Sequence, residues 1–72
     1  MKDHEKLLRD VLRVRFEFLV KEMKEANNFM AYIKEVEIIK FIKHTKALAV
    51  AIPCLWDLVT EMESDLMSEV TK

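Results

Sequence analysis

Lys46-Ala-Leu-Ala-Val-Ala-Ile-Pro-Cys-Leu-Trp-Asp57 is the most apolar stretch of the chain, and we expect the fold to be built around it. The residues between Lys46 and Asp57 carry no charge and include the only proline, the only cysteine and the only tryptophan. A helix that crosses a membrane needs about 20 apolar residues, so this stretch is too short to do so. It is predicted to lie in a core, and no membrane span is expected.

Length and composition indicate one small all-α domain over residues 1–72. The chain has 72 residues, of which 51% are hydrophobic, and it contains no glycine. Without glycine, tight hairpin turns and phosphate-binding loops are hard to form, so we expect helices joined by abrupt corners. A chain this short buries only about 60% of the surface that its unfolded form exposes. Homo-oligomerisation is therefore expected to complete the fold.

Cysteine use and charge bear on location and packing. A lone thiol and a charged N-terminus without an apolar segment favour a reducing, cytoplasmic setting. The net charge is −1, but residues 1–46 carry +3 and residues 47–72 carry −4. Opposite charges attract, so the last element is predicted to pack antiparallel on the first.

The first helix is predicted over residues 3–26, with Asp3 as its N-cap. Its apolar arc spans roughly 200°, whereas a helix that faces one core needs about 100°. We therefore expect two partners for this helix, and we assign its flank Leu7, Val14 and Phe18 to a partner-binding surface. The stripe expected to face the core comprises Leu8, Val11, Leu12, Leu19, Met23 and Ala26.

Two charged residues, Arg15 and Glu22, interrupt this arc. None of the neighbours of Arg15 three or four positions away can neutralise it. Either both side chains extend to the edge of the stripe, or they pair across an interface with a second copy. The second alternative predicts a dimer interface that contains Arg15, Leu19 and Glu22, with antiparallel first helices.

The second helix is predicted over residues 29–44, after a corner at Asn27-Asn28. It is apolar on two nearly opposite sides. One side carries Phe29, Tyr32, Ile33, Val36 and Ile39. The other side carries Ile38, Phe41 and Ile42, which we assign to the partner-binding surface.

The third helix is predicted over residues 46–70, and Thr45 is its candidate cap. Pro53 is expected to bend or break it, because proline removes a backbone donor and disfavours helical geometry in the residue before it. The fold expected from the whole chain is thus a helical hairpin plus a third helix bent or broken near Pro53. The inward stripe of the third helix comprises Leu55, Leu58, Val59, Met62, Leu66 and Val70.

No set of residues has the spacing of a catalytic or metal site. Cys54 lies in the apolar stretch, with His44 as its nearest candidate base, and the two histidines are forty positions apart. The carboxylates of Glu61 and Asp65 fall on a predicted solvated face. We therefore expect no enzyme activity, no cofactor and no metal.

By elimination, the sequence favours a non-catalytic protein-interaction module. Such a module would act as a regulator, inhibitor or adaptor that binds a larger protein of unknown identity, as a homodimer. The alternative is a small DNA- or RNA-binding regulator that uses Lys40, Lys43 and Lys46. The net charge does not support nucleic-acid binding, and the mixed polar face of the first helix does not support membrane-surface binding.

Overall fold

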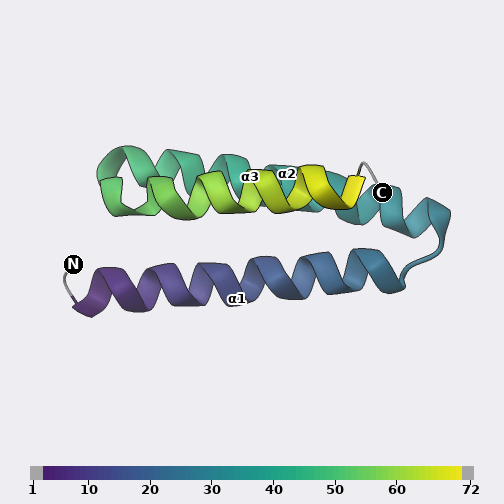
Figure 1. Cartoon of the computed structure of the whole chain (residues 1–72), viewed down its shortest axis with the longest axis horizontal. Coiled ribbons are helices and arrows are strands. Elements are labelled where there is room, and N and C mark those ends of the chain that lie inside the picture. The colour runs from purple at the N-terminus through teal and green to yellow at the C-terminus, as the bar shows by residue number, and fades with distance from the viewer. Residues whose placement is uncertain (1–2, 71–72) are drawn as a thin grey trace.

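Helices make up nearly all of residues 3–70, the part of the chain that the structure, a computed structural model, describes. The elements in chain order are α1 (Asp3–Glu25), α2 (Asn28–Ala51), a short 3₁₀ helix η1 (Pro53–Leu55) and α3 (Trp56–Val70). α2 runs antiparallel to α1 and α3, which both point the same way (Figure 1). The bundle measures 40 × 17 × 17 Å. The prediction of an all-α domain with three helices is confirmed.

The corner between α1 and α2 lies at the two asparagines, as predicted. α1 ends at Glu25, and Asn27 caps α2 because its Oδ1 accepts a hydrogen bond from the Met30 backbone N–H at 2.9 Å. Asn27 has φ −71° and ψ 172°, and no residue among those described has a positive φ. The corner therefore relies on side-chain capping and uses no left-handed residue.

The second corner lies later than predicted. α2 passes through Thr45 and ends at Ala51, so the predicted end at residue 44 and the start of a third helix at 46 are wrong. Thr45 caps nothing, since its hydroxyl donates to the Phe41 carbonyl one turn earlier, at 2.9 Å. The break comes at Ile52 (φ −127°, ψ 83°), the residue that Pro53 excludes from helical geometry. Pro53 thus separates the second helix from the third.

The core lies along the line where the three helices meet. Its buried apolar residues are Phe16, Leu19, Ile38, Ile42, Ala49, Leu55, Leu58, Val59 and Met62. Thr45 is also buried, and its hydroxyl is satisfied by the bond within α2. Of the apolar residues between Lys46 and Asp57, only Ala49 and Leu55 are buried in this core. Leu48, Val50 and Trp56 are exposed, so the prediction that this stretch lies in the core is wrong for most of its residues.

The two apolar sides of α2 are exchanged relative to the prediction. Ile38 and Ile42 are buried in the core, and Phe41 packs against it. Tyr32 and Ile39, on the opposite side, are exposed. Because both sides are apolar, periodicity alone does not determine which of them turns inward. The proposed docking face at Ile38, Phe41 and Ile42 is therefore unavailable in this conformation.

α3 packs beside α1 in a parallel direction, and the predicted antiparallel packing is wrong. Two connections that each reverse the chain bring the third helix back to the direction of the first (Figure 1). The predicted attraction between the two segments is nevertheless present, because Arg9 and Arg13 of α1 both pair with Glu61 of α3.

Candidate protein-binding surface

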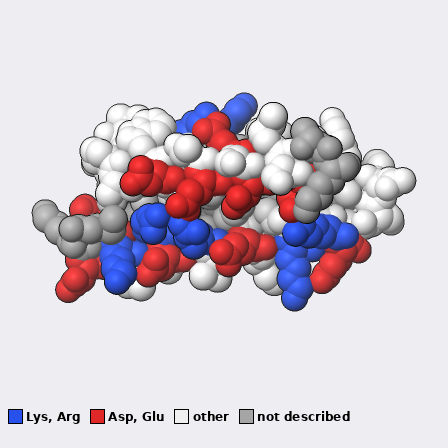
Figure 2. Space-filling view, viewed as in Figure 1, with Lys and Arg blue, Asp and Glu red and all other residues white. Residues whose placement is uncertain are grey.

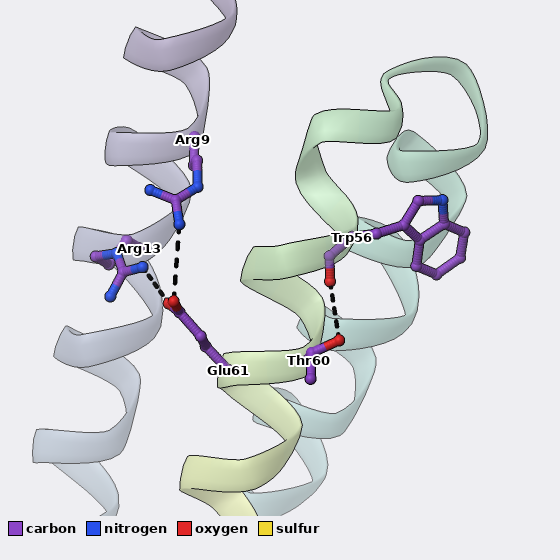
Figure 3. A network of polar contacts seen from close by, with 5 residues as sticks. All are labelled: Arg9, Arg13, Trp56, Thr60 and Glu61. Carbon is purple, nitrogen blue, oxygen red and sulfur yellow. Dashed lines mark hydrogen bonds and ion pairs between the residues drawn. The ribbon is translucent and has the colours of Figure 1, made fainter. Parts of the chain in front are cut away.

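Ion pairs fill the edge where α1 meets α3. The guanidinium groups of Arg9 and Arg13 lie on the carboxylate of Glu61, the former at 3.8 Å (Figure 3). Farther along, Lys24 pairs with Glu69 at 3.2 Å. Figure 2 shows the same pattern as blue side chains on α1 facing a red row on α3. These charges are used within the chain, so this edge is not the strongest candidate for a partner.

Thr60, beside this network, forms a hydrogen bond within its own helix. Its hydroxyl donates to the Trp56 carbonyl at 3.1 Å (Figure 3). Glu61 forms ion pairs with two arginines. The structure therefore gives no support to an acid–base site made of Glu61 and Asp65. Among residues 3–70 no group of three or more His, Cys, Asp or Glu is arranged to hold a metal ion. Cys54 lies half-buried in η1.

The two charges that interrupt the arc of α1 have different surroundings. Glu22 lies 3.6 Å from the ammonium group of Lys34 on α2, so it is neutralised within the chain. Arg15 is exposed and makes no ion pair with any described residue. Leu19, the third residue assigned to a dimer interface, is buried in the core. Of that predicted interface, only Arg15 is left both accessible and unpaired.

The flank of α1 is a continuous exposed apolar stripe. Leu7, Val11, Val14 and Phe18 are 64, 56, 63 and 52% exposed, respectively. We call these four residues the α1 stripe. Three of them are the flank assigned from the sequence, and the fourth, Val11, was expected to face the core. The inward side of α1 is instead centred on Phe16 and Leu19, turned away from the stripe.

A second apolar patch lies where α2 meets α3. It consists of Tyr32, Ile39, Met67 and Val70, all exposed, and next to it a shallow groove runs between Ile42 and Leu66. Tyr32 and Ile39 were predicted to share one side of the second helix, and Val70 was assigned to the inward stripe of the third helix. That assignment of Val70 is wrong, because the residue is half exposed. Tyr32 and Ile39 carry the sequence signal for this patch, since both lie on the second apolar side of α2.

The basic residues of α2 are partly neutralised. Lys46 pairs with Glu63 at 2.9 Å, and Lys34 lies within reach of both Glu22 and Glu37. Lys40 and Lys43 are exposed and form no ion pair within residues 3–70. The predicted stripe of three lysines is therefore reduced to two free cations.

The lengths of the helices and the comparisons with known proteins do not identify a function. No helix among the described residues combines the length and the apolar character needed to cross a membrane. Comparison of the chain with models of protein families, with curated proteins and with solved structures found no match.

Proposed function

We propose that this chain is a non-catalytic helical module that works by binding another protein, as a regulator, inhibitor or adaptor. The observation that carries the proposal is the α1 stripe. Its four side chains remain more than half exposed although the three helices already enclose a core without them. Contiguous exposed apolar surface of this kind is typical of interaction sites.

The free energy available at the stripe is modest. Burying a Val, Leu or Phe side chain completely is worth about 1.5–3 kcal/mol, so side chains still half exposed have roughly 1 kcal/mol each left to gain. Four of them give roughly 4 kcal/mol, which only matches the low end of the 4–15 kcal/mol cost of association. A partner must therefore supply apolar surface of its own and contact the charges beside the stripe.

The test replaces Val14 at the centre of the stripe with aspartate and uses Ser64→Asp as the matched control. Ser64 is exposed on the polar outer side of α3. We expect both variants to keep the helical circular dichroism of the parent chain, and to keep its unfolding midpoint at a chain concentration too low for self-association. Only Val14→Asp should lose a protein that the parent chain captures. Unfolding of Val14→Asp would show that the stripe is core, and unchanged capture would show that the stripe does not bind the captured protein.

Nucleic-acid binding is the second candidate, because Lys40, Lys43 and His44 are exposed on α2. Two lysines make a weak phosphate-binding surface, and Lys46 is tied to Glu63. This function requires salt-sensitive retention on heparin or duplex DNA that the double variant Lys40→Glu/Lys43→Glu abolishes. If the parent chain is not retained at low salt, the second candidate fails.

A further inference from the structure

The α1 stripe has the spacing of a coiled-coil seam. Its members follow one another at intervals of four, three and four residues. In heptad notation Leu7 and Val14 occupy d positions, and Val11 and Phe18 occupy a positions. Val at a and Leu at d are the residues typical of parallel two-stranded coiled coils, a pattern that Val11 and Leu7 follow. The stripe therefore fits another helix with a matching seam.

We propose that this helix is α1 of a second copy of the chain, packed parallel and in register. The inference rests on the proposed function, since it names the partner that occupies the same stripe. In this arrangement each residue of the stripe meets its own counterpart across a two-fold axis. Both copies then bury equal apolar surfaces, so the partner supplies the matching apolar surface that the stripe by itself lacks.

The charges beside the stripe select the parallel orientation. Asp10 is at a g position and Arg15 at an e position, where side chains of paired helices meet. Both are exposed, and neither forms an ion pair with a described residue of its own chain. In the parallel pair Asp10 of each copy faces Arg15 of the other, so the symmetry creates two ion pairs.

The antiparallel alternative is less favourable. In an antiparallel pair that keeps all four apolar layers, Leu7 lies opposite Phe18 of the other copy. The same register sets Asp10 against Glu17 of the other copy, twice, and leaves Arg15 without an acidic partner. The parallel pair does set Glu17 against Glu22, but Glu22 is already held by Lys34 within its own chain. Like-charge repulsion is therefore weaker in the parallel pair.

The groove between α1 and α2 also favours the parallel orientation. It is lined on one side by Arg15 and on the other by Lys40 and His44 of α2, with Glu37 as its acidic member. A parallel partner brings the acidic edge of its own α1, Asp10 and Glu17, to this side of the stripe. Lys40 has no acidic partner within residues 3–70, so it is free to meet that edge.

Charge reversal tests the orientation. Asp10→Lys and Arg15→Glu each turn both intermolecular pairs into repulsions, and we expect each to raise the dimer dissociation constant about tenfold or more. The double variant, and an equimolar mixture of the two single variants, should return to within about threefold of the parent value, since opposite charges face each other again. Ser64→Lys serves as the control, and analytical ultracentrifugation gives the dissociation constants.

Two outcomes of this experiment overturn the proposal. An antiparallel dimer would be tightened by Asp10→Lys, because the new ammonium group would then face Glu17 of the other copy. A parent chain that stays monomeric at hundreds of micromolar would exclude the second copy altogether. The proposed function would survive a monomer if the parent chain captures a different protein and Val14→Asp does not. Failure of the dimer proposal can therefore be distinguished from failure of the proposed function.

Cross-linking gives an independent check of register. In a Cys54→Ser background, Val14→Cys should oxidise rapidly to a symmetric disulfide-linked dimer, because the two thiols meet at the two-fold axis. Ser64→Cys in the same background should cross-link only at the slow rate of random collision. Faster linkage between a Val11→Cys chain and a Val14→Cys chain than within either one would show antiparallel packing and refute the proposal.

Discussion

Replacing Ile38 and Ile39 one at a time with alanine tests which side of α2 faces the core. The two residues are adjacent and chemically identical, but Ile38 is 0% exposed and Ile39 is 39% exposed. The sequence pattern predicted the reverse, with Ile39 inside and Ile38 on a docking face. The pair therefore provides its own matched control.

The magnitude follows from the carbon atoms removed. Ile→Ala deletes three of them, worth about 0.8 kcal/mol each, so the Ile38 change loses about 2.4 kcal/mol of transfer free energy. The cavity that remains raises the cost to about 3–4 kcal/mol. For Ile39 the exposed fraction lowers the transfer loss to about 1.5 kcal/mol, and the higher helix propensity of alanine returns about 0.4 kcal/mol. The expected difference between the two variants is about 2 kcal/mol or more.

Urea unfolding followed by circular dichroism measures this difference. A chain of this length has a total stability of roughly 4–11 kcal/mol, so Ile38→Ala should bring it close to unfolding. With a urea slope of about 1 kcal/mol/M, its midpoint should fall about 2 M below that of Ile39→Ala. Both variants must be compared at one chain concentration, because the proposed self-association would make the midpoint depend on concentration. An equal or larger loss for Ile39→Ala would refute the orientation of α2.

Two further predictions concern the polar contacts. Asn27→Ala removes the cap of α2 and should lower the free energy of unfolding by about 1 kcal/mol, whereas Asn28→Ala should change it by less than half as much; equal losses in thermal unfolding would contradict the capping role. Glu61→Gln removes the partner of Arg9 and Arg13 at an exposed edge, so it should cost less than about 1 kcal/mol. That cost should shrink in 1 M salt, and a loss that salt does not change would argue against an electrostatic origin.

The sequence was sufficient where a local signal had one interpretation. The Asn27-Asn28 corner was predicted because asparagine is a strong N-cap, and the side chain of Asn27 caps α2 in the structure. A bend or break near Pro53 was predicted for a similar reason, and the structure has a break, since the ring of proline constrains Ile52 directly. Leu7, Val14 and Phe18 were placed on the flank of α1 by periodicity, and they lie on its exposed side.

The sequence was insufficient where a residue supports two structures equally well. Thr45 can cap a helix or bond to the carbonyl one turn earlier inside a helix, and nothing local distinguishes the two roles. Ile38 and Ile39 lie on two apolar sides of α2 that are equivalent by pattern. Ile38 is buried in one core cluster with Leu58 and Met62 of α3, a long-range association that periodicity does not contain. The partner of Glu22, Lys34, is likewise a tertiary contact.

The outer sides of α3 and α1 differ, and this contrast argues that the α1 stripe has a use. On the side turned away from the core, α3 presents Asp57, Thr60 and Ser64, all exposed and polar. This side of α3 is polar, as expected for a surface helix, whereas the exposed apolar Met67 and Val70 lie toward α2. On α1 the exposed positions of the α1 stripe are apolar instead. Polar residues at these four positions would leave the core intact and improve solubility. Surface of this kind is retained at a cost to solubility, so the simplest account is that a second helix covers it.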